Sequence, residues 1–128
     1  MTHQENDMKI AKWLGWRGPI QGTMTLQFSF GHIVIPQNIV SEYYELPSGG
    51  KATLPCWTAS DSDAVKLLPQ LVAKGYQVEL ANTGNGVPDA WGMWIFREPE
   101  QAAIVKLIGQ STIAAAISGA VVILIESI

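Results

Sequence analysis

The chain has 128 residues, a length that suits one domain, with 48% hydrophobic and 15% charged residues. This composition excludes a disordered tail, and a formal net charge of −3 is contrary to the basic face with which proteins bind nucleic-acid duplexes. The single cysteine, Cys56, rules out an intramolecular disulfide and, with no cleavable signal sequence, indicates a reducing cytoplasm. We therefore expect one soluble, cytoplasmic domain over residues 1–128, with residues 1–7 frayed.

The first elements are expected to be a helix and then a strand. Apolar residues recur at three- and four-residue spacing over residues 5–16, which indicates an amphipathic helix that ends near Gly18. Residues 23–30 alternate between apolar and polar side chains. Such alternation is typical of a strand with one buried face.

A hairpin is expected next. Gly31-His32 predicts a tight turn into a short strand, and Pro36 bars that strand from continuing in the interior of a sheet. Residues 39–46 are a candidate for a further strand. The sequence leaves open whether the strand-rich insert, residues 21–55, joins the main sheet or forms a separate hairpin.

A central helix is expected to begin after Ser60. Ser60 and Asp63 have the spacing of a capping box, and acidic residues suit the positive end of a helix. An apolar stripe then runs to Gly75, which supplies a C-terminal stop. Pro69 interrupts this stripe and removes one backbone hydrogen bond, so we expect a single helix with a bend at that residue.

The C-terminal half predicts a second hairpin. Residues 76–80 alternate as a strand, residues 82–89 form a loop rich in Asn, Gly and Pro, and residues 91–96 are apolar on both faces. We therefore expect residues 91–96 to be a central strand, paired with residues 76–80 and covered by two layers. Residues 102–108 fit either a strand or a helix.

The apolar C-terminal segment predicts a buried helix over residues 113–125, capped by Ser111 or Thr112. As a helix it spans about 20 Å, which is short of the roughly 30 Å hydrocarbon core of a membrane. The uncharged residues 107–125 leave a membrane anchor as an alternative. We expect instead that this helix joins copies of the chain into a homo-oligomer. Four of its residues are expected to face the sheet: Ile117, Ala120, Val121 and Leu124.

Together these elements predict an α+β fold in the order α-β-β-(β)-α-β-β-α. Its small antiparallel or mixed sheet would be layered between helices, similar to an α/β/α sandwich. This arrangement is expected because one layer of helices covers only one face of the strand over residues 91–96.

Three parts of the chain resemble the phage ABA sandwich domain, a small α/β/α family of phage and prophage proteins of Gram-positive bacteria. Residues 10–16 resemble its opening helix, which ends in Gly-Trp, and Trp57 with residues 60–78 resembles its capped central helix and Lys-Gly-Tyr strand entry. Residues 94–96 and 112–120 resemble its last strand and helix. The strand-rich insert and the strongly apolar last helix depart from the family pattern. The resemblance implies the fold and a phage origin, and no particular chemistry.

Residues with catalytic or metal-binding chemistry are few. The two histidines, His3 and His32, and Cys56 do not have the spacing of zinc ligands, so we predict no metal site and no cofactor. We expect Cys56 to be a small buried residue, and Asp61 and Asp63 to act as helix caps. A small nucleotide or peptide hydrolase that uses Cys56 with His32, or the two aspartates, is the rival hypothesis.

Two arginines next to aromatic residues are candidate ligand-binding groups. Arg17 directly follows Trp16, and a guanidinium beside an aromatic ring can bind a phosphate while a base stacks on the ring. Arg97 closes a strand that contains another tryptophan. Two tyrosines of the insert add hydrogen-bonding aromatic surface, and the Gly-rich loop 82–89 suits the lip of a pocket. The predicted ligand-binding residues are Trp16, Arg17, Tyr43, Tyr44, Asn85, Trp94 and Arg97.

The sequence thus favours a non-enzymatic function, because no nucleophile–base pair, metal cluster or cofactor motif stands out in it. Together with the resemblance, it predicts a small phage-encoded accessory binding protein in the cytoplasm of the bacterial host. One concrete form is an anti-defence protein that engages a host protein or sequesters a small nucleotide-like signal. The alternatives are the hydrolase and a membrane protein anchored through residues 107–125.

Overall fold

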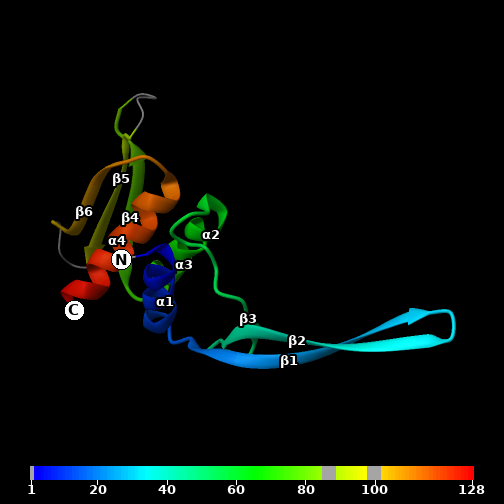
Figure 1. Ribbon diagram of the computed structural model, residues 1–128. Coiled ribbons are helices and arrows are strands. Elements are labelled where there is room, and N and C mark those ends of the chain that lie inside the picture. The colour runs from blue at the N-terminus through cyan, green and yellow to red at the C-terminus, as the bar shows by residue number, and fades with distance from the viewer. Residues whose placement is uncertain (1, 85–88, 98–101) are drawn as a thin grey trace. The chain divides into compact units, whose positions relative to one another are not determined.

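The computed structural model describes most of the chain: residues 2–84, 89–97 and 102–128 (Figure 1). Within these ranges, the description omits the side chains of residues 23–26, 28 and 37–40. The chain divides into two compact units. We call Met1–Leu14 with Pro55–Ile128 the core unit and Gly15–Leu54 the hairpin unit. The mixed α+β class with small antiparallel sheets is confirmed.

The core unit contains a three-stranded antiparallel sheet. Its strands, in spatial order, are β4 (Tyr76–Asn82), β5 (Trp91–Arg97) and β6 (Ala103–Gln110). Strand β5 is central, as its apolar sequence predicted, and it forms the predicted hairpin with β4. The segment that fitted either a strand or a helix is the edge strand β6.

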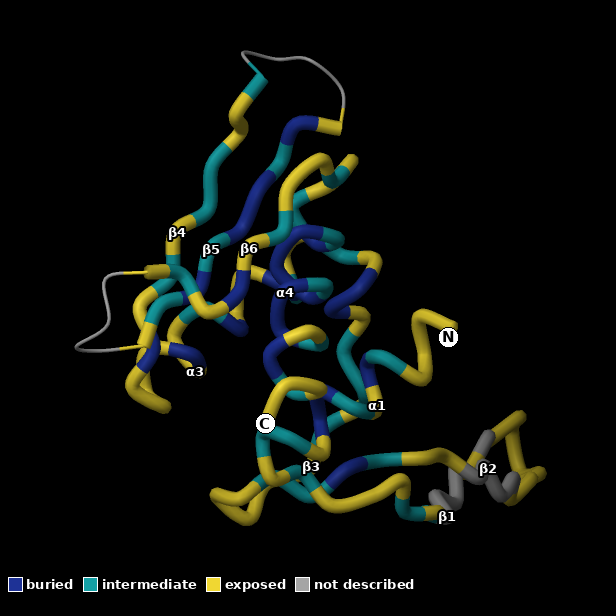
Figure 2. The backbone as a smooth tube through the Cα atoms, turned by 90° about the vertical axis from the view of Figure 1, so that its left-hand side faces the viewer, coloured by how far each residue is buried: buried dark blue, intermediate teal, exposed yellow. Residues whose placement is uncertain are grey.

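Among the described residues of the core unit, four helices accompany this sheet: α1 (His3–Trp13), α2 (Asp61–Val65), α3 (Leu67–Ala73) and α4 (Ile113–Ser127). Helix α4 packs on β5 and β6 and also contacts α1 and α2, whereas α3 packs on β4 (Figures 1 and 2). The residues of α4 that were expected to face the sheet are all buried: Ile117, Ala120, Val121 and Leu124. Thr112 caps this helix, because its hydroxyl accepts a hydrogen bond from the Ala115 N–H.

The helices cover one face of the sheet. On that face Met93 and Ile95 are fully buried, whereas Trp94 and Phe96 on the opposite face of β5 are half-buried. The second layer that we expected over the strand is therefore incomplete among the described residues. Helix α4 contacts α1 and α2 as well as β5 and β6, so these helices pack together as one layer and are not divided between the two faces of the sheet.

The N-terminal residues differ from the expected frayed end. Helix α1 begins at His3, and the Thr2 hydroxyl caps it by accepting a hydrogen bond from the Glu5 N–H. Asp7, inside this segment, is buried. A polar sequence at a terminus can thus form helix when a cap and a buried partner hold it.

The central helix is split instead of bent. Helix α2 ends at Val65 and α3 begins at Leu67, with Lys66 between them. In a continuous helix the ring of Pro69 would clash with the carbonyl of Val65, four residues earlier. The split relieves this clash and places Pro69 in the first turn of α3, where a backbone N–H has no helical partner in any case.

The hairpin unit forms a second three-stranded sheet in the order β1-β2-β3. Its strands are β1 (Arg17–Phe30), β2 (Ile33–Glu45) and β3 (Lys51–Ala52). The predicted turn at Gly31-His32 is confirmed, and β2 continues through Pro36 because it pairs with a single long neighbour over this part. The strand-rich insert is therefore a hairpin with its own sheet.

Candidate functional site

The β1–β2 hairpin presents an apolar tip to solvent. Phe30 is 66% exposed, Ile33 62% and Val34 54%, and Ile35 beside them is also exposed. The alternating sequence had predicted a buried face here, and for Phe30 that prediction is wrong. A two-stranded ribbon has no second layer of its own. An alternating sequence can therefore form a strand here although its apolar face is not buried.

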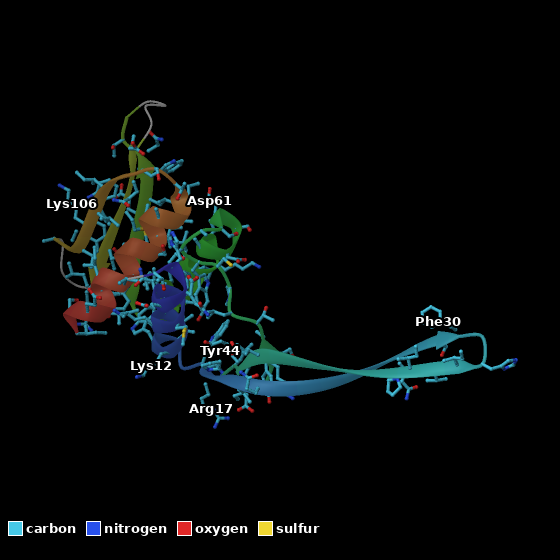
Figure 3. All side chains as sticks on the ribbon, viewed as in Figure 1. Lys12, Arg17, Phe30, Tyr44, Asp61 and Lys106 are labelled. Atoms are coloured by element: carbon cyan, nitrogen blue, oxygen red, sulfur yellow. The ribbon has the colours of Figure 1, made fainter. Side chains whose placement is uncertain are left out.

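Sequence reasoning missed this tip, although a signal for it was present. Residues 18–41 contain no Asp, Glu, Lys or Arg, so this long hairpin has no such charged side chain except near its base. Figure 3 shows Phe30 at the opposite end of the hairpin from Arg17 and Tyr44. Exposed apolar groups gathered in one place mark interaction surfaces more often than scattered single ones do.

The base of the hairpin is an aromatic cluster. The rings of Trp16 and Tyr44 are 6.3 Å apart and inclined by 53°, and Tyr44 is buried. Gly18 has a φ of +152°, and a Cβ atom on it would lie 2.8 Å from the Tyr44 ring. Burial, followed by the negative charge of Glu42, raises the pKa of the Tyr44 phenol, which therefore stays neutral. Tyr44 thus fixes the start of the hairpin.

Arg17 forms an ion pair within the hairpin unit. Its guanidinium forms an ion pair with the Glu45 carboxylate, which is its cross-strand neighbour in the β1–β2 ladder. The Arg17 side chain is 79% exposed, so this pair contributes at most about 1 kcal/mol to stability. The other cation of the hairpin unit, Lys51, is also engaged, since its ammonium lies 4.9 Å from the centre of the Tyr43 ring. A phosphate that binds the remaining N–H groups of Arg17 would lie beside the negative charge of Glu45.

The structure does not bring Arg97 to Trp94. Residues three apart in a strand point to opposite faces of the sheet. The Arg97 guanidinium lies 5.6 Å from the centre of the Tyr76 ring, whereas Trp94 lies over Gly92, where a Cβ atom would approach its ring to 2.7 Å. The predicted ligand-binding residues therefore fall into separate groups in two units, and Asn85 lies outside the described residues.

Each aspartate of the rival hydrolase accepts a backbone hydrogen bond, but only Asp61 caps a helix. Ser60 caps α2 by accepting from the Asp63 N–H, and Asp63 itself accepts a hydrogen bond from the Cys56 N–H at 3.0 Å. Asp61 accepts from the Ala114 N–H at 2.8 Å and so satisfies a free donor at the start of α4 (Figure 3). The predicted capping role is confirmed for Asp61, although the helix it caps is α4, whereas the Asp63 carboxylate holds the loop at Cys56.

Cys56 is exposed, so the expectation of a buried thiol was wrong. The cause is its place in the loop just before the buried Trp57, where neighbouring side chains point in different directions. His32, its proposed base, lies in the turn of the other unit. Among the described residues, no three His, Cys, Asp or Glu side chains are grouped so as to hold a metal ion.

One buried carboxylate was not foreseen. Asp7 is 5% exposed and accepts hydrogen bonds from the Thr58 N–H at 3.0 Å and from the Thr58 hydroxyl at 3.3 Å. Burial raises the pKa of Asp7, although the two Thr58 hydrogen bonds act in the opposite direction. Asp7 therefore ties α1 to the loop before α2, and both groups lie in the core unit.

The apolar surface of α4 is used inside the core unit. Ala114, Ala116 and Ser118 are buried in addition to the four residues predicted to face inward. In the described part of the chain, no helix is both long and apolar enough to span a bilayer. Self-association through α4 stays a prediction, but the exposed patch that motivated it is largely covered.

Comparisons with protein-family models, curated proteins and solved structures found no match to this chain. The resemblance to the phage ABA sandwich domain accordingly stays a prediction from the sequence.

Proposed function

We propose that the protein is a non-enzymatic accessory binding protein whose β1–β2 hairpin binds another protein. The observation that carries this proposal is the exposed apolar tip, Phe30 with Ile33, Val34 and Ile35, on a hairpin whose residues 18–41 are uncharged. Protein interfaces combine apolar side chains at their centre with few charges, which is the composition of this tip. A strand edge adds backbone hydrogen bonds to such a contact.

The charges of the hairpin unit favour a protein partner over a nucleic acid. Binding to a phosphate backbone depends on lysine and arginine side chains that replace counterions. The hairpin unit has Arg17, paired with Glu45, and Lys51, placed over the Tyr43 ring. Neither lies near the tip, because both belong to the end of the hairpin where β3 pairs.

The phage origin implied by the sequence resemblance would place this activity in a bacterial host, with an anti-defence role as its concrete form. Capture of a small nucleotide is the second candidate. It is favoured by the high exposure of the Arg17 guanidinium one residue from Trp16. A phosphate bound to Arg17 would lie beside the negatively charged Glu45 carboxylate, so the protein contact is the better supported of the two.

Photo-crosslinking in host cells tests the proposed function. A benzophenone amino acid is placed at Phe30 of the full-length chain and, as a matched control, at Val72, which is 59% exposed on α3. We expect an adduct of defined mass from position 30 and none from position 72. Absence of an adduct at position 30, or equal adducts at both positions, would contradict the proposal.

A further inference from the structure

We propose that the partner of the hairpin is a second copy of this chain, and that the outer edge of β1 pairs antiparallel with β1 of that copy. The inference rests on the proposed function, since it names the occupant of the same surface. The product would be a four-stranded sheet in the order β2-β1-β1-β2, built around a two-fold axis.

The first argument is the incomplete sheet of the hairpin unit. Strand β3 pairs only with Tyr44 and Glu45, so over the described residues the rest of β1 and β2 is a two-stranded ribbon. At about 3.3 Å per residue, the 14 residues of β1 extend roughly 45 Å. Two-stranded ribbons are marginally stable in water, whereas sheets of three or more strands with an apolar face are stable. An additional strand would therefore stabilise this one.

The second argument concerns which backbone groups point outward. Pro36 pairs with Gln27 and has no N–H to donate. A regular antiparallel ladder tolerates proline at a non-hydrogen-bonded pair, where the backbone groups of both residues point away from the neighbouring strand. Gln27 and, two residues on, Ser29 then present their N–H and C=O groups at the outer edge of β1. On the outer edge of β2 the matching donor is missing at Pro36.

The third argument is that β1, from residue 20 to its end, lacks the features that prevent edge pairing. Exposed edges are usually protected by lysines, by prolines or by bulges. Residues 20–30 of β1 contain neither charge nor proline, and the irregularity in its pairing lies before them, between Arg17 and Ile20. The outer edge of β1 is thus open along the part next to the tip.

The fourth argument selects a second copy as the occupant. Antiparallel pairing about a two-fold axis places one segment opposite its own copy, so a charged residue near the axis would lie close to its like-charged counterpart. The uncharged residues 18–41 avoid this repulsion in every register. The same pairing extends the sheet beside Phe30 and reduces the exposure of the apolar tip.

A matched pair of variants tests the inference in purified full-length protein. Ser29 and Val34 are cross-strand partners and both are exposed, so lysine at either position adds the same charge at the same height of the ribbon. We expect sedimentation analysis to show a dimer whose Kd rises at least tenfold in Ser29→Lys and much less in Val34→Lys. Ser29 lies on the pairing strand and Val34 on the outer one. A monomer at all concentrations, or equal effects of both variants, would overturn the inference.

Hydrogen exchange supplies a second readout that does not depend on a variant folding. The Gln27 and Ser29 amides are expected to be protected at high protein concentration and to exchange rapidly on dilution, while amides within the β1–β2 ladder stay protected. Equal exchange of Gln27 and Ser29 at both concentrations would overturn edge pairing. If the chain is monomeric but position 30 crosslinks to a different protein, only this inference fails; if no crosslink forms either, the proposed function fails as well.

Discussion

The core unit and the hairpin unit both contain alternating apolar strands, but these strands have different surroundings. In the core unit, Tyr76 of the alternating strand β4 is buried because α3 packs on that strand, and Ile95 and Val105 are buried because α4 lies across the sheet. In the hairpin unit, Phe30 and Ile33 are exposed because no helix of that unit covers the two-stranded ribbon. The difference shows that alternation predicts a strand, whereas burial depends on what else the chain places over that strand. An exposed alternating strand is therefore a candidate contact surface.

The largest expected effect tests this contrast with one kind of substitution. Ile95→Ala leaves a cavity in the core and is expected to lower the free energy of unfolding by about 2–5 kcal/mol. Ile33→Ala, at a position 62% exposed, is expected to change it by about 0.5 kcal/mol or less. Urea denaturation at a protein concentration too low for self-association measures both. If Ile33→Ala lowered the free energy of unfolding as much as Ile95→Ala, the tip would have to be packed against another part of the same chain.

An intermediate effect follows from the buried Asp7 of the core unit. Burial raises its pKa in the folded state above the value near 3.8 expected for the unfolded chain. The folded state therefore binds this proton more readily, so its contribution to stability is full below the unfolded pKa and is lost as pH rises through the raised pKa. Asn at this position cannot titrate.

The measurement compares the free energy of unfolding of the natural chain and of Asp7→Asn from about pH 7 to about pH 4. The natural chain is expected to gain stability relative to the variant as the pH falls toward the unfolded pKa of Asp7. A difference between the two proteins that does not change with pH, or that changes in the opposite sense, would show that Asp7 is not held in a desolvated site.

The smallest effect is expected at the two arginines, one in each unit. Arg17→Ala removes an exposed ion pair with Glu45, and Arg97→Ala removes a contact with the Tyr76 ring. Each is expected to lower the free energy of unfolding by about 1 kcal/mol or less. Native mass spectrometry of the purified proteins should give spectra without a nucleotide-sized mass for the natural chain and both variants. A nucleotide that is lost only in Arg17→Ala would favour nucleotide capture.

The sequence by itself determined the local features of this protein. Period-two and helical patterns predicted the mixed α+β class, the central position of β5 and the buried face of α4. Gly31-His32 predicted the hairpin turn, and Ser111 or Thr112 were the predicted caps of α4, of which Thr112 is the cap. These features depend on backbone preferences and on hydrogen bonds between residues a few positions apart, so the relevant information is contiguous in the chain.

Only the tertiary structure decided which surfaces are covered and which groups meet. Asp61 reaches the start of α4 across 53 residues of sequence, and Asp7 reaches Thr58 across 51. The exposure of Phe30 likewise depends on the absence of a packing layer within its unit, among the residues described, and not on its own strand pattern. Burial and long-range hydrogen bonds depend on segments distant in sequence, which a local period does not encode.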